Sequence, residues 1–519
     1  MANRNLQSSM MANLVVVICL LSVVSMLQAF EIDEATTIEK ASTILESSRG
    51  QQEEDLRAFV GFGSVAAIES YKEETRKCAG WLRDFLKSRL GMQDANLYES
   101  GYRNPVVVGS STVNASDKDK PAVVIYGHYD VQPVDGEWTI SDPFELKKIV
   151  LDGYGEVFTG RGSQDCKGTL YASLSAIAAL HDSLDGGLAS LPVRIIVCVE
   201  GEEEIGSPGF GVFLKENIGL FDGAEIVFSA DGGQPALDGG GLRLSNRGLF
   251  GVQIDAYGAN TDLHSGTFGG SILNPIVALS RVVSSLHDPE TNRIAVEGFY
   301  DSVEELTEEE RAELVVVDDV AEAARLGVSQ MIGEIGYSTM ERKTVRPTLE
   351  LSGIWGGFQD EGIKTVLPAE AHAKITMRLV SDQNPDDIYQ KLEEHIAKIA
   401  PVVARGLKVS LQRLNPGAKA YKAPRHSEVF KLVKSELTSL FGKEPVLMRA
   451  GGSVNAFADF HEIASLESIS FGFGAPDALQ HAPDERFRLY SLQLGQKAYM
   501  SLILKAAKLF GKTQPNGEL

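Results

Sequence analysis

The feature that most constrains this chain is a series of apolar segments that end at acidic or imidazole side chains. Residues 122–127 (Ala-Val-Val-Ile-Tyr-Gly) have the composition of a buried strand, and His128 and Asp130 follow at its end. Side chains two positions apart in an extended chain point to the same side, so Asp130 can accept a hydrogen bond from one imidazole nitrogen of His128. The other nitrogen would face a metal ion, because carboxylates orient histidine ligands in this way. Alone the motif is weak, since a histidine at a strand end is more often structural.

The same arrangement recurs further along the chain. A glycine-rich segment (160–168) carries Asp165 in front of a predicted amphipathic helix, whose apolar residues repeat with a 3.6-residue period. Three predicted strands, 193–199, 225–230 and 468–474, lead to the remaining candidates, which are Glu203, Glu204, Asp231 and His481. Sites in open α/β sheets form outside the carboxyl ends of the strands. Acidic and imidazole groups gathered there need a cation to offset their repulsion, so the sequence predicts a metal centre.

Several candidates also have an ordinary interpretation. The run Glu202–Glu204 could be a solvated acidic loop, and His264 could satisfy a hydrogen bond inside a core. Arg378 closes an alternating strand (371–380), where a structural salt bridge is as plausible as recognition of a carboxylate. The joint occurrence of the motifs, rather than any one of them, favours the metal centre.

Five segments resemble motifs of the M20 family of co-catalytic zinc peptidases, especially the branch of the cytosolic nonspecific dipeptidase and carnosinase. These segments are 127–133, 160–168, 203–207, 262–266 and 451–453, and the resemblance spans roughly residues 35–510. It implies two divalent metal ions, zinc by preference and manganese or cobalt as alternatives, because mixed imidazole and carboxylate ligands suit these ions.

The resemblance also implies a role for each site residue. His128 and Asp231 would bind one metal, Glu204 and His481 the other, and Asp165 would bridge the two. Asp130 would orient His128, and Glu203 would be the general base that activates a water shared by the metals. The substrate-binding positions would be His264, Arg378 and Ser453, with His264 reaching the active site of a partner subunit.

The sequence departs from the family pattern at two places. Cys166 follows the bridging Asp165 where the dipeptidase branch usually has a second Asp, a position whose side chain is not a ligand in the family. Asn415-Pro-Gly417 stands where mammalian dipeptidases have a His in a glycine-rich loop. By contrast, Tyr129 and Val131-Gln-Pro133 fit the dipeptidase branch better than the acyl-amino-acid deacylase branch.

The order of predicted elements indicates an inserted domain. Between about 245 and 415 the pattern becomes β-α-β-β-α-β, which is the ferredoxin-like split motif, and it includes an acidic insertion at 288–345. Metal candidates lie on both sides of this block and none within it. We therefore expect an α/β catalytic domain in two parts (30–244 and 416–519), a three-layer sandwich by resemblance, interrupted by an α+β lid and dimerisation domain (245–415).

Composition narrows the class of partner. The 519 residues carry a formal net charge of −22, which disfavours nucleic acid and anionic membrane surfaces. A hydrophobic content of 43% is ample for two or more packed domains.

The N-terminal segment indicates targeting to the secretory pathway. Residues 1–29 contain one basic residue and an apolar run from Leu14 to Leu27, typical of a signal peptide; an uncleaved membrane anchor is the alternative. Asn114-Ala-Ser116 is a potential glycosylation site. The three cysteines after the leader, Cys78, Cys166 and Cys198, indicate no disulfide framework.

Together these features predict a secreted, homodimeric two-metal peptidase that hydrolyses short peptides, most of all dipeptides. An N-acyl amino acid amidohydrolase with the same metal centre is the nearer alternative. A non-catalytic extracellular binding protein is the more distant one, because neither the base nor any ligand is missing.

Overall fold

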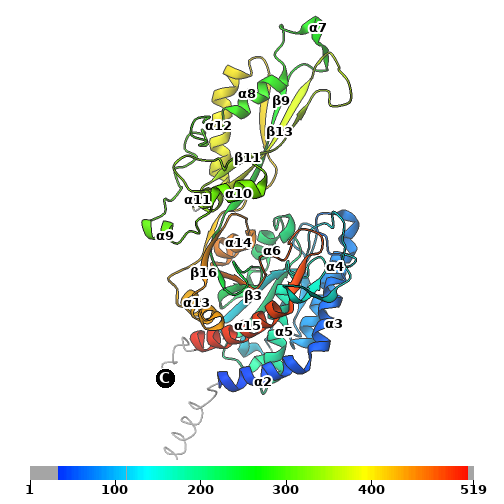
Figure 1. Ribbon diagram of the computed structural model, residues 1–519, viewed down its shortest axis with the longest axis vertical. Helices are drawn as coiled ribbons and strands as arrows, with labels where there is room; N and C mark the ends of the chain where they lie inside the picture. Colours follow the sequence, from blue (N-terminus) through cyan, green and yellow to red (C-terminus); the bar gives the residue numbers. More distant parts are fainter. Residues whose placement is uncertain (1–32, 113, 381, 512–519) are drawn as a thin grey trace, which may run out of the picture.

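The computed structural model describes residues 33–112, 114–380 and 382–511, so the predicted signal peptide (1–29) lies outside the described residues. Figure 1 shows a large α/β unit below a smaller, elongated unit. The sheet of the large unit has nine strands. Its order is β1 (Asn96–Tyr98), β2 (Val106–Ser110), β6 (Arg194–Glu200), β3 (Ala122–His128), β7 (Ala224–Ser229), β17 (Ser468–Gly472), β8 (Gly241–Asn246) and β15 (Tyr421–Lys422), with β16 (Val446–Ala450) beside β8.

The centre of this sheet is parallel. Strands β6, β3, β7 and β17 pair in parallel, whereas β2 and β8 flank them in antiparallel pairing. Every residue of β3 and β6 is buried. Parallel strands covered on both faces read as continuous apolar runs, which is why these strands were visible in the sequence.

Helices cover both faces of the large sheet. On one face α5 (Lys167–Ser183) packs against α15 (Leu489–Phe510), α2 (Glu34–Ser47) and α3 (Arg49–Val60). On the other face α6 (Phe210–Glu216) and α14 (Asn455–Ala464) pack together (Figure 1). The neighbours Tyr126 and Gly127 of β3 show the alternation, since Tyr126 contacts aromatic rings of α6 and α14 while Gly127 lies under Leu170 of α5. The arrangement has three layers.

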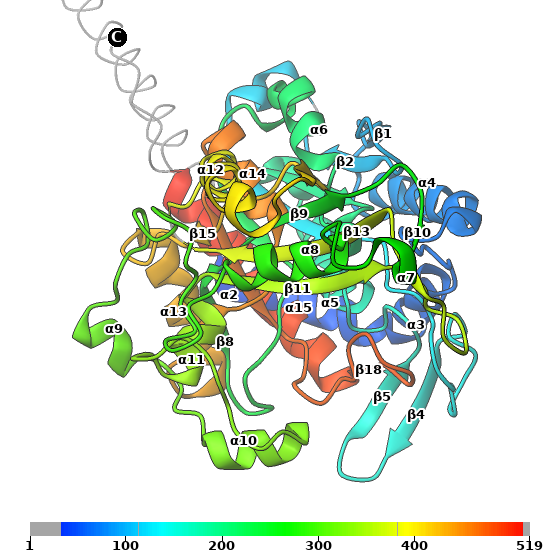
Figure 2. The same ribbon diagram turned by 90° about the horizontal axis from the view of Figure 1, so that it is seen from above.

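The remaining elements of the large unit lie at its margins. Helix α4 (Lys72–Arg89) packs on β2, and α13 (Glu428–Phe441) packs on α15. A three-stranded sheet, in the order β18 (Arg486–Arg488), β5 (Gly155–Thr159) and β4 (Lys147–Leu151), projects at one side (Figure 2). Short 3-10 segments occur at Glu69–Tyr71, Ala115–Asp119, Gly187–Ser190, Glu203–Ile205 and Ile218–Phe221.

The smaller unit has its own sheet and its own apolar core. Its strands lie in the order β11 (Thr348–Gly356), β13 (Glu370–Leu379), β9 (Gly248–Tyr257) and β14 (Lys408–Arg413), and all pairs are antiparallel. Helices α8 (Pro275–Ser284) and α12 (Pro385–Val403) cover it. In chain order the elements are β9-α8-β11-β13-α12-β14, the split motif expected from the sequence.

Two connections join the units. Only Arg247 separates β8 of the large sheet from β9 of the small one, and the chain returns between Arg413 and Tyr421. At the far end of the small unit, β10 (Leu263–His264) pairs with β12 (Val366–Leu367) and leads into α7 (Ser265–Phe268) (Figure 1). The acidic insertion contains α9 (Glu308–Ala312), α10 (Asp319–Leu326) and α11 (Thr339–Thr344).

Local chemistry explains where helix α8 starts. It begins at Pro275, because the Asn274 side chain accepts the Ile276 N–H and proline favours the first helical turn. In the part of the chain that the structure describes, no helix is long and apolar enough to cross a membrane.

Candidate metal centre

The predicted metal candidates converge at the carboxyl ends of the central parallel strands. His128 ends β3, Glu203 and Glu204 follow β6, and Asp231 follows β7. His481 lies in the longer segment after β17. The expectation that Asp165 also leaves a strand of the same open sheet was wrong, because it follows β5 of the separate three-stranded sheet and precedes α5. That glycine-rich segment carries Asp165 back to the shared edge.

Asp165 lies between the two histidines. Its Oδ1 is 3.5 Å from Nε2 of His128, and its Oδ2 is 3.1 Å from Nε2 of His481. Burial alone would raise the pKa of Asp165, but the neighbouring imidazoles of His128 and His481 hold it well below its usual range. An ionised carboxylate that turns one oxygen to each of two imidazoles has the geometry of a bridging ligand.

Asp130 orders both His128 and the glutamate loop. Its side chain is fully buried, with Oδ1 3.3 Å from Nδ1 of His128, and its backbone oxygen lies 3.1 Å from the same nitrogen. The Asp130 carboxylate also accepts the backbone N–H groups of Glu203 and Glu204, at 3.2 and 3.0 Å. It therefore directs Nε2 of His128 outward and fixes the two glutamates beside it.

The three consecutive glutamates have different surroundings, so the interpretation as a solvated acidic loop was wrong. Glu202 is 2% exposed and accepts the backbone N–H groups of Arg103, Asn104 and Gly209, a structural role. Glu204 Oε2 accepts a hydrogen bond from Gln132 at 2.8 Å and lies 3.4 Å from Nε2 of His481. Glu203 Oε2 points to the other histidine, 4.0 Å from Nε2 of His128.

The residues present fit two divalent ions. Donor atoms of Asp165, Glu204 and His481 lie within 4.8 Å of one another, as do those of His128, Cys166 and Asp231. Nε2 of His128 and Oε1 of Glu204 are buried with no hydrogen-bond partner, which is costly unless something else binds them. Burial and neighbouring carboxylates raise the pKa values of Glu203 and Asp231. A cation bound at each of the two donor groups would provide a partner for the unpaired buried atoms and would offset the repulsion between the carboxylates.

The metal-free protein should lose stability as pH rises. Burial, followed by the charge of Asp165, raises the pKa of Glu204 from 4.5 to about 8. Because the folded pKa exceeds the unfolded one, this contribution is full below pH 4.5 and is lost as pH rises through about 8. The loss amounts to up to about 1.4 kcal/mol per pH unit. Thermal unfolding with a chelator across this range should show it, and Glu204→Gln should flatten the slope. A chelated protein with increasing stability over the same range would contradict this account.

Glu485 is a buried residue that the sequence did not reveal as part of the site. Its carboxylate accepts the backbone N–H groups of Gly162, Gln164 and Asp165, each at 2.9 Å, and pairs with buried Arg161 at 2.8 Å. Glu485 lies in the segment that carries His481, and it therefore fixes the position of the loop that carries Asp165. His481 itself has a left-handed backbone (φ 59°), which is unfavourable outside glycine and occurs where the surroundings enforce it.

Two of the three predicted substrate-binding residues meet where the two units join. Arg378 of β13 donates to the Ser453 hydroxyl at 2.6 Å. Nearby, Nδ2 of Asn455 donates to the backbone oxygen of Gly206, which links this segment to the glutamate loop. A cavity of about 640 Å³ is lined by five cations, Arg247, Arg342, Lys343, Arg346 and Arg378, and by two acids, Glu334 and Glu350. Within the described residues neither Arg247 nor Arg378 forms an ion pair, and burial lowers both of their pKa values. The cavity suits an anionic ligand.

His264 does not join this group. It ends β10, directly before α7, at the tip of the small unit that lies farthest from β3 (Figure 1). Its Nδ1 accepts the Gly266 N–H, and its side chain is exposed. Asn415, at the other departure from the family pattern, accepts the N–H of Gly251 and so has a structural role. Asn114 is exposed at the start of a 3-10 segment, as a glycosylation site requires.

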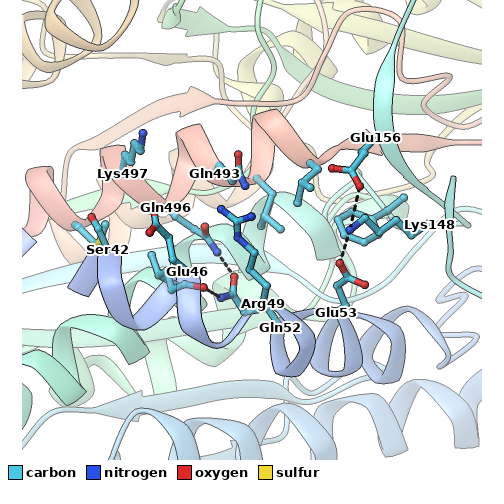
Figure 3. A pocket seen from close by; sticks show the side chains of 15 residues that line it. Ser42, Glu46, Arg49, Gln52, Glu53, Lys148, Glu156, Gln493, Gln496 and Lys497 are labelled. Carbon is cyan, nitrogen blue, oxygen red and sulfur yellow. Dashed lines mark hydrogen bonds and ion pairs between the residues drawn. The ribbon is translucent and has the colours of Figure 1, made fainter. Parts of the chain in front are cut away.

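A second pocket, of about 240 Å³, lies between α2, α3 and α15 (Figure 3). Some of its polar side chains pair with each other: Gln496 donates to Gln52, and Lys148 pairs with Glu53 and Glu156. None of the predicted site residues lines it. We assign it no part in the chemistry.

Comparison with known proteins identifies the class. Residues 124–505 match the model of peptidase family M20/M25/M40, and the chain belongs to this family. The Cys-Gly metallodipeptidase of Schizosaccharomyces pombe is 30% identical over 412 residues, 78% of this chain and 83% of that protein. The Beta-Ala-His dipeptidase of Homo sapiens is 27% identical over 458 residues, 86% of this chain and 88% of that protein.

Solved structures agree with this family assignment. An M20 family metallo-carboxypeptidase from Sulfolobus solfataricus superposes with a TM-score of 0.74 at 28% identity, covering 89% of this chain and 99% of that one. The family assignment confirms the resemblance, the zinc-peptidase α/β fold class and the prediction of a peptidase. One solved M20 peptidase, from Bacillus subtilis, is described as a dinuclear metal-binding peptidase; it shares 12% identity with this chain. These comparisons favour neither of the two alternatives, an N-acyl amino acid amidohydrolase or a non-catalytic binding protein.

Proposed function

We propose that this protein is a two-metal dipeptidase that hydrolyses short peptides to free amino acids, with zinc as the preferred ion. The observation that carries the proposal is the position of Asp165 between His128 and His481, with Glu203 beside one histidine and Glu204 beside the other. The metallodipeptidases among the relatives support the choice of dipeptides.

The protein's own residues prepare the reaction. His128 and Asp231 would hold one ion, Glu204 and His481 the other, with Asp165 between them. When bound, the ions supply Lewis acidity, which polarises a carbonyl and lowers the pKa of water to roughly 7. Manganese and cobalt are alternatives to zinc, because the same imidazole and carboxylate donors suit them.

Glu203 is the proposed proton shuttle. Its side chain is 15% exposed, and burial followed by the charge of Asp231 raises its pKa well above the usual range. A raised pKa brings a carboxyl group closer to the working pH of a general acid and base. Glu203 would take the proton of the attacking water and deliver it to the leaving amine.

The cationic cavity is the proposed site for the substrate's terminal carboxylate. Arg378, held by Ser453, and Arg247, held by backbone oxygens, line this cavity and form no ion pair among the described residues. Guanidinium groups bind carboxylates through two parallel hydrogen bonds. A free carboxylate would orient the peptide bond with respect to Glu203.

A substrate panel tests the proposed function. Dipeptides should be hydrolysed faster than the matching N-acetyl amino acids. Amidation of the dipeptide's C-terminus should raise KM, because it removes the charge that Arg378 binds. A preference for N-acetyl amino acids would instead identify an amidohydrolase. Failure to hydrolyse either class with metals bound would contradict the proposal.

His264 is proposed to act as an oxyanion donor in the neighbouring subunit of a homodimer. It directly precedes α7, which lies at the tip of the small unit, away from the strands that carry the metal candidates (Figure 1). Loss of one oxyanion donor costs about 10²–10³ in turnover, so His264→Ala should be nearly inactive, as should Glu203→Gln. Co-expressed as mixed dimers, they should regain part of the activity, because one of the two sites then has an intact base and an intact partner histidine. Mixed dimers without recovery would show that His264 does not act across the interface.

We also propose secretion, on the strength of the apolar run before Glu31. N-terminal sequencing of the secreted protein should begin between Met26 and Glu31. A glycosidase should increase its gel mobility, and Asn114→Gln should remove that shift. A membrane fraction that retains Met1 would identify an uncleaved anchor instead.

A further inference from the structure

Cys166 lies inside the predicted metal centre and has no part in the reaction outlined above. Its Sγ belongs to the group in which donor atoms of His128, Cys166 and Asp231 lie within 4.8 Å of one another. We propose that the Cys166 thiolate is a further protein ligand of the ion held by His128 and Asp231, in addition to the bridging Asp165. The proposal rests on the proposed two-metal centre and adds a sulfur donor where the resembling dipeptidases have a carboxylate that is not a ligand.

The distances allow direct coordination. Bonds of about 2.0–2.3 Å around a tetrahedral zinc leave neighbouring donor atoms roughly 3.3–3.8 Å apart. The donor atoms of this group already lie within 4.8 Å of one another. A small contraction around an ion would bring the sulfur into the coordination sphere.

A second observation points to a missing ligand at the same place. Nε2 of His128 is buried and has no hydrogen-bond partner, although its Nδ1 is fixed by Asp130. Cys166 is fully buried as well. A buried imidazole nitrogen and a buried thiol that share one space with Asp231 form a donor set of the kind that binds zinc.

The backbone fixes the position of the thiol. Cys166 is the N-cap residue of α5, a helix of 17 residues. Thr169, one turn into α5, has its hydroxyl 3.5 Å from Sγ. On coordination the S–H bond would break and its proton would pass to solvent.

The other cysteines lack this setting and provide a matched control. Cys78 and Cys198 are also free and fully buried, but neither belongs to a group of possible metal donors within the described residues. Cys198 lies in β6, the strand that leads to the glutamate loop. Burial is therefore common to the three cysteines, and proximity to metal donors distinguishes Cys166.

A sulfur donor would make the two ions unequal. The ion at His128, Cys166 and Asp231 would favour soft metals such as zinc and cobalt over manganese, because thiolates select softer ions. The ion at Asp165, Glu204 and His481 would keep the preference of a carboxylate and imidazole site. We expect the two sites to differ in metal affinity for this reason.

Cobalt spectroscopy on the full-length protein tests the assignment without relying on activity. The metal-free protein is loaded with Co²⁺, the bound metal is counted, and the near-ultraviolet sulfur-to-cobalt charge-transfer band is recorded. The wild type and Cys198→Ser should bind two ions and show the band. Cys166→Ser should lose the band, and one of its two sites should bind zinc at least about tenfold more weakly.

Cys166→Asp guards against a folding artefact, because it installs the residue of the resembling family. It should bind two ions without the band. Two bound cobalt ions with no band in the wild type, or a band that persists in Cys166→Ser, would overturn the role of Cys166 alone. Fewer than two bound ions in the wild type would contradict the two-metal centre as well.

Discussion

Glu203→Gln should lower turnover by at least about 100-fold while both metals remain bound, because general acid–base catalysis contributes about 10²–10⁴-fold. The amide keeps the shape of the side chain and the backbone hydrogen bond to Asp130, but it no longer accepts a proton from water. The measurement is kcat on a dipeptide, with metal content determined on the same sample.

Glu204→Gln is the matched control for that experiment. Its carboxylate faces His481 and Gln132 rather than His128, so this variant should lose metal together with activity. Equal loss of metal in Glu203→Gln would show that the two roles are reversed or wrongly assigned.

Glu485→Ala should destabilise the metal-binding loop severely. It would leave the Arg161 guanidinium, which is 1% exposed, without its ion-pair partner, and three backbone N–H groups without their acceptor. Breaking a buried ion pair by removing one partner costs about 3–5 kcal/mol. Denaturant unfolding should report this loss, and the metal affinity at Asp165 should decrease with it.

Asp484→Asn is the control for this second substitution. Asp484 is the neighbouring acid and also accepts hydrogen bonds, from Thr139 and Ile140, but at the molecular surface. Its replacement should cost only about 1 kcal/mol and leave metal binding unchanged. A Glu485→Ala protein as stable as the control would show that the loop does not depend on this carboxylate.

The sequence predicted the parts of the site that have a local signal. His128, Glu204 and Asp231 follow strands buried on both faces, and such strands appear as uninterrupted apolar runs. The small unit could also be predicted, because apolar residues alternate along the segment that forms β13. The alternating burial of this strand reflects a sheet with only one covered face. The burial pattern and the element order together predict the split motif.

Long-range contacts had no such signal. Glu485 lies 320 positions from Asp165, and nothing around it in the sequence indicates the three N–H groups that it accepts. Glu202 was indistinguishable in the sequence from Glu203 and Glu204, because only folding brings Arg103 and Asn104 to it. Asp165 was assigned to the wrong sheet for the same reason, since strand pairing is not encoded next to the strand.

Metal removal and stepwise reconstitution test the central claim most directly. We predict two ions per chain in the purified protein, no dipeptide hydrolysis after chelation, and full recovery only when the second equivalent of zinc has bound. Asp165→Asn, which weakens the residue placed between both histidines, should prevent that recovery. Dipeptide hydrolysis at an undiminished rate in the metal-free protein would contradict the account.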